Sequence, residues 1–380
     1  MNHRTLWLVA LGGLLTLLLA PVWILWCPGA TPWRTHTYHT LLYDQIARRV
    51  TADAHSIDER LERLLDYVQM HMWPAADVAP YEGKPIDYLV RGIGWCDYQS
   101  KTYMRLLAAC DIPARYAMLR DANGVSPHTI AEVHHLGRWG AVDVLFGIRF
   151  TDAQGQPLSF EALCKTPSLL DAQPMVAVLD RRLPDEAIQI RQVYGRVLTA
   201  GVPPRRSSPA IQRLTFFDRA VVLYRRWAGQ RFLDWYQDRY FASLGLHPPS
   251  ASAEALQLAR HWHLAGRVLL ARHTYQRCAQ EAAEPSLRSE ALFWLGVLQW
   301  ELEGDAASAQ RTFETLLAQD ANSRWAPMAW YYLGRCEEDL GHSDRAQAWY
   351  AKAAVQGGID AACRRDLFKD REPIGGFAAR

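Results

Sequence analysis

Apolar and polar residues follow different periods in different parts of the chain. Residues 6–26 carry no charged side chain, and 21 residues at helical rise span roughly 30 Å, which matches a bilayer core. This stretch predicts a membrane helix that acts as an uncleaved signal anchor, with a cleaved signal peptide as the alternative. Further on, Ser56 and Glu59 form a capping box, and apolar residues recur at helical spacing over 57–72. That second pattern predicts an amphipathic helix packed on a core.

Between residues 128 and 144 the pattern changes to the alternation that is typical of strands. Segments 128–133 and 139–144 are two such strands, with Gly137 between them. They predict a hairpin. A turn near 135–137 brings His128 roughly opposite Asp143 or its near neighbours, although the pattern does not fix the register.

The C-terminal third repeats a glycine, an alanine and an aromatic residue with the spacing Gly-x4-Ala-x3-aromatic. The glycines are Gly266, Gly304 and Gly341, so the unit recurs after 38 and then 37 residues. Such units predict stacked helical pairs with a concave surface. A protein or peptide partner is the expected ligand of that surface, and a purely structural cap is the alternative.

Segment 181–240 is basic and aromatic, with twelve arginines, no lysine and five acidic residues. Residues 201–209 divide it, and its second half predicts one long amphipathic helix. Contact with anionic lipid or a glycan is one interpretation. A connector helix that packs its aromatic residues on the next domain is the other, and it is favoured.

Composition narrows the class of protein. The chain has 380 residues, 49% of them hydrophobic and 22% charged, which suits a folded protein of two or three domains. A net charge of +2 indicates no nucleic-acid partner. Seven cysteines do not form a disulfide framework in a chain of this length, and the odd number leaves at least one free thiol.

The candidate chemistry lies around Cys96. Glycines precede this cysteine and helix formers follow it, so its thiol should lie at a helix N-terminus, where free N–H groups and the helix dipole favour the thiolate. His128 can act as base and Asp143 can hold the imidazole in its working tautomer. His134 and His135 lack metal-ligand spacing, so neither a metal nor a cofactor is expected.

Four segments of this region together resemble the bacterial transglutaminase-like family, which is distantly similar to papain. They are residues 94–96, 106–115, 128–133 and 139–143. The resemblance covers roughly residues 50–150. It implies an α+β fold with a cysteine helix packed on a sheet, and the roles nucleophile for Cys96, base for His128 and orienter for Asp143. In two places the chain departs from the family pattern: Asp111 replaces the usual glycine, and Ile130 stands where an aromatic residue often follows the histidine.

The C-terminal units resemble tetratricopeptide repeats, which implies an all-α module. The predicted organisation is a membrane anchor over 1–30, the α+β cysteine domain over 31–180, basic connector helices over 181–250 and repeats over 251–380. The cysteine domain and the repeats are expected to have separate cores. Residues 74–85 are expected to form a loop that walls the cleft.

Arg4 precedes the uncharged stretch, so the positive-inside rule places the N-terminus in the cytoplasm and the remainder in the periplasm. The predicted function is an inner-membrane, extracytoplasmic cysteine enzyme that acts on peptide or amide bonds of a protein or peptide substrate. Hydrolysis and acyl transfer stay open. The alternative is a non-catalytic envelope scaffold that binds a partner through its repeats and a peptide or glycan through the cysteine domain.

Overall fold

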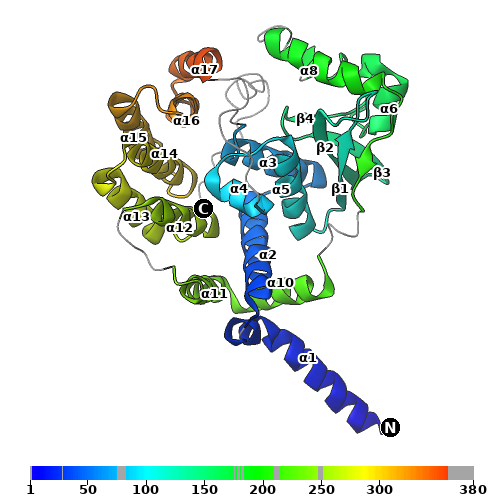
Figure 1. Cartoon of the computed structure of the whole chain (residues 1–380), viewed down its shortest axis with the longest axis vertical. Coiled ribbons are helices and arrows are strands. Elements are labelled where there is room, and N and C mark those ends of the chain that lie inside the picture. The colour runs from blue at the N-terminus through cyan, green and yellow to red at the C-terminus, as the bar shows by residue number, and fades with distance from the viewer. Residues whose placement is uncertain are drawn as a thin grey trace.

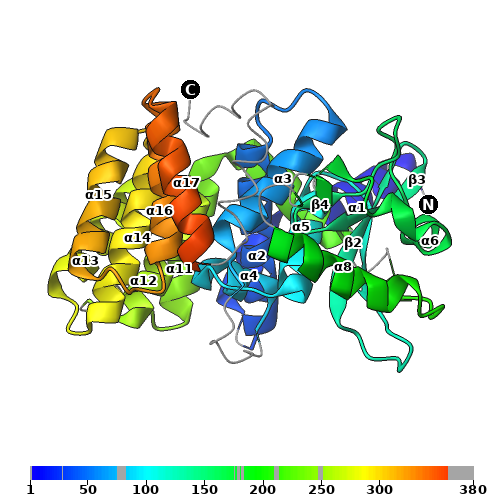
Figure 2. The same cartoon turned by 90° about the horizontal axis from the view of Figure 1, so that it is seen from above.

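The computed structural model describes residues 2–27, 29–74, 83–174, 176–177, 180, 184–208, 214–246 and 251–357. The repeat helices lie on one side of the molecule and the β-sheet on the other, with α2 (Thr31–Val50), α3 (Ile57–His71) and α4 (Pro85–Arg91) between them (Figures 1 and 2). The N-terminal helix α1 (His3–Trp26) projects away from this body (Figure 1).

The sheet has five antiparallel strands in the order β4-β3-β2-β1-β5. Their bounds are β1 (Ala114–Leu119), β2 (His128–His135), β3 (Arg138–Asp143), β4 (Ile148–Arg149) and β5 (Arg205–Arg206). The predicted hairpin is confirmed, since β2 pairs with β3 and His135 lies opposite Arg138. Leu136 and Gly137 form its two-residue turn with φ of 51° and 75°, the left-handed pair that a tight hairpin needs.

Helices cover both faces of the sheet. Ala131 and Val142 join the core formed with α3 and α5 (Cys96–Ala109), whereas Ile130 and Ala141 face a second core. This second core is completed by α6 (Phe160–Lys165) and α8 (Pro184–Leu198), near the short 3-10 helix at Pro167–Leu169. Because both faces are covered, consecutive residues of β2 and β3 are buried, and the alternation predicted from the sequence does not mark a solvent-facing side.

Two predicted helix starts are confirmed. Ser56 caps α3 by accepting the N–H of Glu59 at 3.1 Å, and the Glu59 carboxylate accepts the N–H of His55. Helix α5 begins at Cys96. After α5 the chain turns through Asp111, whose φ of 59° is in the left-handed region. This conformation is most common for glycine, but aspartate also adopts it. The backbone at this position is therefore compatible with Asp111.

The basic segment does not form one long helix after residue 209; that prediction was wrong. It forms α10 (Phe216–Ala228) and α11 (Gln230–Ser243), because Gly229 between them takes a φ of 75°. Both helices pack on α2, where the Asp218 carboxylate lies 2.6 Å from His36 Nε2. Helix α8 and strand β5, from the first half of the segment, lie on the sheet instead.

Three helical hairpins form the C-terminal region. They are α12 (Ala253–Ala265) with α13 (Val268–Glu281), α14 (Pro285–Glu301) with α15 (Ala306–Gln319), and α16 (Ala326–Asp339) with α17 (Ser343–Gly357). The repeated glycines lie between the paired helices with positive φ, and the repeated alanines and aromatic residues are buried. At Gly296 a Cβ atom would approach the ring of Phe313 to 2.6 Å. Close helix contact therefore explains that glycine.

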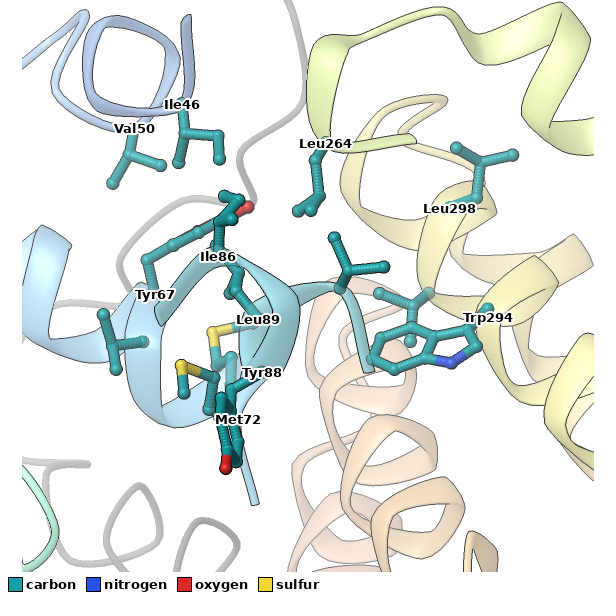
Figure 3. Close-up of a cluster of buried hydrophobic side chains, with 14 of the residues drawn as sticks. Ile46, Val50, Tyr67, Met72, Ile86, Tyr88, Leu89, Leu264, Trp294 and Leu298 are labelled. Atoms are coloured by element: carbon teal, nitrogen blue, oxygen red, sulfur yellow. The ribbon is translucent and has the colours of Figure 1, made fainter. Parts of the chain in front are cut away.

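The expectation of separate cores was wrong. One continuous cluster of buried side chains runs from the α2–α5 helices into the repeats. Figure 3 shows this junction, where residues of α2, α4, α12 and α14 converge, among them Ile46, Val50, Leu89, Leu264, Trp294 and Leu298. Helix α12 thus packs on both α2 and α4, and the two parts of the chain are expected to unfold together.

Helix α1 covers the stretch that was predicted to span a membrane, and Trp7, Leu8 and Trp23 on it are exposed. Among the residues that the structure describes, however, no helix is both long and apolar enough for a membrane crossing. The predicted span is therefore not found. The side chains of residues 10, 14, 17–19 and 21 lie outside the described residues, as do residues 75–82 of the loop that was expected to wall the cleft.

Candidate active site

Cys96 is the first residue of α5, and the chain before it is held rigidly. Gly94 N–H donates to the carbonyl of Trp73 at 2.9 Å, and Trp73 N–H donates to the carbonyl of Gly92 at 2.9 Å. No side chain caps the first turn of α5, where Trp95 is the N-cap residue. The N–H groups beside the half-buried thiol of Cys96 are therefore available to an anion.

His128 and Asp143 meet at the buried end of the β2–β3 hairpin. His128 Nε2 lies 2.7 Å from Asp143 Oδ2, and the two side chains are 3% and 0% exposed. Ala131 pairs with Val142, so Asp143 lies opposite Ile130, which is two residues from His128 on the same strand. The two side chains are thus diagonal neighbours on one face of the sheet, as the hairpin prediction required.

Cys96 completes the group. Its thiol lies close enough to the His128 imidazole to help raise the pKa of His128. Because Nε2 is held by Asp143, Nδ1 is the ring nitrogen that remains for the sulfur. The structure thus brings together all three residues that the sequence singled out, although they come from a helix and two strands.

The electrostatics favour a charged imidazole. Burial by itself lowers the pKa of His128, but Asp143 and then Cys96 outweigh it and raise that pKa to about 10. Burial conversely disfavours the Asp143 carboxylate, yet His128, the N–H of Phe146 and the hydroxyl of Tyr194 hold its pKa below the ordinary value. A carboxylate and an imidazolium therefore coexist here at neutral pH.

Tyr194 is a site residue that the sequence reasoning missed. Its hydroxyl donates to Asp143 Oδ2 at 2.7 Å, while the N–H of Phe146 donates to Oδ1 at 3.0 Å. The Tyr194 ring also lies edge-on to His128, with the centroids 6.1 Å apart. Tyr194 comes from α8, 51 residues after Asp143. The only signal in the sequence was an aromatic residue on the apolar side of that helix.

The neighbouring histidines serve other contacts. His135 Nε2 lies 3.1 Å from Asp58 Oδ2, and His134 packs edge-on against Trp139. In the described part of the chain, no group of three or more His, Cys, Asp or Glu side chains is arranged to hold a metal ion. The six described cysteines are free thiols, and Cys363 lies outside the described residues.

A comparison with protein families assigns the region that contains these residues. The family model of the transglutaminase-like superfamily matches residues 44–144, the range that runs from α2 to the end of β3 and holds Cys96, His128 and Asp143. Residues 44–144 form a transglutaminase-like domain. A helical region follows it towards the C-terminus. No curated protein and no solved structure matches the chain.

The repeat helices hold the segment that enters the cysteine helix of the transglutaminase-like domain. Arg260 of α12 is 1% exposed and donates to the carbonyls of Val90 and Leu89 at 3.2 and 3.3 Å, which satisfies the C-terminal end of α4. Its guanidinium lies 3.4 Å from the ring centroid of Trp294 on α14. Helix α4 leads directly to Gly92 and so to Cys96.

A buried ionic cluster joins the same parts. The Glu301 carboxylate of α14 lies 2.9 Å from Arg49 on α2, and 3.2 Å from both His71 on α3 and His263 on α12. Burial disfavours its ionisation, but His71 and Arg49 hold the pKa of Glu301 well below the ordinary value. Separation of Arg49 from Glu301 would leave the buried carboxylate without its counter-charge. The cluster therefore fixes how α14 of the repeats sits on α2 and α3 of the domain.

Proposed function

We propose that this chain is a cysteine enzyme that acts on peptide or amide bonds of a protein or peptide substrate. The observation that carries the proposal is the position of His128, with Asp143 on one ring nitrogen at 2.7 Å and the Cys96 thiol near enough to help raise the pKa of the imidazole. An isolated buried cysteine would need neither partner. A thiol, a base and an orienting carboxylate in contact are the parts that covalent catalysis requires.

In the proposed mechanism, the proton of the Cys96 thiol resides on His128 Nδ1 in the resting site, so a thiolate is paired with an imidazolium, and this thiolate attacks the amide carbonyl carbon. The free N–H groups of the first turn of α5 stabilise the resulting oxyanion. The imidazolium then returns its proton to the leaving amine as the C–N bond breaks. A thioester on Cys96 remains.

A second nucleophile resolves the thioester. Water yields a carboxylic acid, which is hydrolysis, and a primary amine yields a new amide, which is acyl transfer. In either case His128 accepts the proton of the attacking group and the thiolate of Cys96 leaves. Asp143 and Tyr194 keep the imidazole oriented through both halves of the reaction.

Partner binding and localisation are further parts of the proposal. The inner helices α12 and α14 of the tetratricopeptide-like repeats contact α2, α3 and α4 of the same chain. A protein partner would therefore bind the outer helices α13, α15 and α17. The uncharged stretch over 6–26 after Arg4 supports an inner-membrane location with the enzyme on the periplasmic side.

The test uses the full chain, a peptide that contains glutamine, and mass spectrometry of peptide and protein. Wild type should release ammonia or cleave the peptide, or incorporate an added primary amine, and Cys96→Ala and His128→Ala should abolish all three. Asp143→Ala should retain partial activity, because it only orients the base. Cys110→Ala serves as a control, since this half-buried thiol lies at the other end of α5.

Equal turnover by Cys96→Ala and wild type would contradict the proposal. If a peptide binds the wild-type protein without any thioester or product, the non-catalytic scaffold is the better description. Circular dichroism of each variant establishes that a loss of activity is not a loss of fold.

A further inference from the structure

A pocket of about 290 Å³ lies where α2, α10 and α11 meet. Its lining consists of Gln45, Arg48, Arg49, Arg225, Arg226, Gly229 and Gln230. None of these residues belongs to the triad or to α5. The volume is close to the lower limit for pockets that hold a small metabolite or a single polar headgroup.

Four arginines of this lining face few acidic groups. The carboxylate of Asp44 is fully buried and forms ion pairs with Arg225 through Oδ2 at 2.8 Å and with Arg226 through Oδ1 at 3.2 Å. Arg49 reaches Glu301, which lies on the repeat side. Arg48 is exposed and makes no hydrogen bond or ion pair with a described residue, so positive charge remains in excess in the pocket.

The buried Arg225 guanidinium is held within the chain, since Nη1 donates to Asp44 and Nη2 donates to Gln45 and Gln230. Arg225 is only 6% exposed, yet its Nε finds no hydrogen-bond partner among the described residues, and the same holds for Nε of Arg49. Burial and the charges of Arg48 and Arg226 lower the pKa of Arg225 against the attraction of Asp44. Arg225 therefore adds positive charge to the pocket, and the guanidinium donors open to an anion are those of the exposed Arg48 and Arg226.

The remaining lining is suited to an oxyanion. Gly229 precedes the first turn of α11, where no side chain caps the free N–H groups. The amides of Gln45 and Gln230 both donate to the carbonyl of Ala265, which fixes their orientation at the pocket. Guanidinium forks and helix N–H groups are the donors that proteins use for phosphate.

We propose that this pocket binds a phosphate group, either free or as part of a phosphorylated small molecule, or on a lipid headgroup. The geometry of the triad has no part in the argument, so the site stands whether or not the enzyme proposal holds. Both sources present the same tetrahedral oxyanion to Arg48 and Arg226.

The surface beside the pocket makes the lipid source worth a separate arm of the test. Phe216, Leu223 and Trp227 of α10 are 73%, 62% and 82% exposed, and their spacing of seven and four residues places them on one face. Trp227 follows Arg226 directly. An exposed apolar face beside arginines is typical of a helix at a membrane interface.

The first arm is calorimetric titration of the full chain in neutral detergent with inorganic phosphate, at a constant ionic strength set with potassium chloride. We expect saturable binding. Arg48→Gln and Arg226→Gln should each weaken it by about tenfold, which corresponds to one charge-assisted hydrogen bond. Arg219→Gln on α10 is the matched control, because Arg219 is exposed and does not line the pocket.

The second arm measures flotation with phosphatidylcholine vesicles, with and without one fifth phosphatidylglycerol. Apolar contacts of α1 and α10 are common to all variants, so only the difference between the two vesicle types reports on the headgroup. A difference that disappears in Arg48→Gln and Arg226→Gln, but persists in Arg219→Gln, supports the lipid source. Phosphate binding without that difference supports the soluble source.

Arg48→Gln is the safest variant, since Arg48 has no described partner whose loss would disturb the fold. The proposal is overturned if neither phosphate nor anionic vesicles bind. It is also overturned if both bind the Arg48→Gln and Arg226→Gln proteins as tightly as wild type.

Discussion

Trp294 of the repeats lies directly against Gly92, four residues before Cys96. A Cβ atom on Gly92 would lie 2.4 Å from Cζ2 of Trp294, and the φ of Gly92 is 73°. The ring cannot move away easily, because Arg260 stacks on it at 3.4 Å. The repeats therefore shape the entry to the cysteine helix, and this contact can be tested by adding one methyl group.

Gly92→Ala should lower the free energy of unfolding by more than the change in backbone conformation alone. A left-handed alanine costs about 1–2 kcal/mol, and overpacking against Trp294 adds about 1–3 kcal/mol. Gly124→Ala is the matched control, since Gly124 has a φ of 77° with no atom within 4 Å of an added Cβ. Urea unfolding of both variants measures the difference. Equal losses would mean that the Trp294 contact imposes no constraint.

Glu301→Gln should destabilise the full chain by about 1–3 kcal/mol, because the half-buried Arg49 loses its counter-charge, while His71 and His263, whose pKa values are lowered, lose a charged acceptor. Glu303→Gln is the control, since the Glu303 pair with Arg272 is closer to the surface and is worth about 1 kcal/mol or less. The measurement is urea unfolding at pH 7.

The pH dependence of this difference follows from the depressed pKa of Glu301. A carboxylate of this kind contributes its full stability above its unfolded pKa, whose ordinary value is 4.5, and loses it as the pH falls through the folded value. The gap between wild type and Glu301→Gln should therefore be constant from pH 7 to about pH 5 and narrow below. A gap that widened on acidification would contradict the assignment of charge.

Asp143→Asn should move the alkaline limb of kcat/KM to lower pH. Asp143 is the main group that raises the pKa of His128 to about 10, and loss of an adjacent opposite charge typically shifts a pKa by about 1–3 units. Tyr194→Phe keeps the carboxylate and should shift the limb far less. A pH–rate profile of the three proteins tests this, and identical alkaline limbs would show that Asp143 does not support the imidazolium.

The same raised pKa has a consequence for stability. His128 is protonated in the folded state up to about pH 10 and in the unfolded state only below its ordinary value of 6.5. Its contribution is therefore fully present below pH 6.5 and is lost as the pH rises towards 10. The difference in melting temperature between wild type and His128→Ala should shrink over that interval.

Ala309→Leu tests the packing of the repeats. Ala309 is fully buried in α15, whose neighbours are α14 and α16, so a larger side chain should cost about 1–3 kcal/mol. Ala318→Leu on the same helix is the control, since Ala318 is exposed. Thermal melts of the full chain provide the comparison, and equal melting temperatures would show that the repeated alanine is not a close-contact position.

Local patterns in the sequence predicted the elements that carry the candidate site. The capping box at Ser56 and the glycines before Cys96 act within a few residues, so the starts of α3 and α5 follow from them. The hairpin is equally local, because a tight turn at Gly137 fixes which residues of β2 and β3 are neighbours. His128 and Asp143 meet for that reason.

Contacts between distant segments could not be predicted in the same way. Tyr194 reaches Asp143 only because α8 covers the second face of the sheet. The helical spacing of apolar residues in α8 does not indicate which carboxylate the Tyr194 hydroxyl will contact. The core shared by α2–α5 and the repeats was not predicted, because the apolar face of a helix does not indicate which element it packs against. The predicted helix continued through Gly229 because a single glycine is tolerated in a helix. In the structure Gly229 takes a φ of 75°, which ends α10.

The central claim, that His128 and Asp143 activate Cys96, is tested most directly by the rate at which iodoacetamide alkylates each cysteine of the full chain at pH 7. Cys27 is exposed and Cys96 is half-buried, so access alone favours Cys27. The account predicts that Cys96 reacts at least about tenfold faster than Cys27, because only the thiolate is nucleophilic, and that His128→Ala removes this advantage. Alkylation of Cys96 at or below the rate of Cys27, unchanged by His128→Ala, would contradict it.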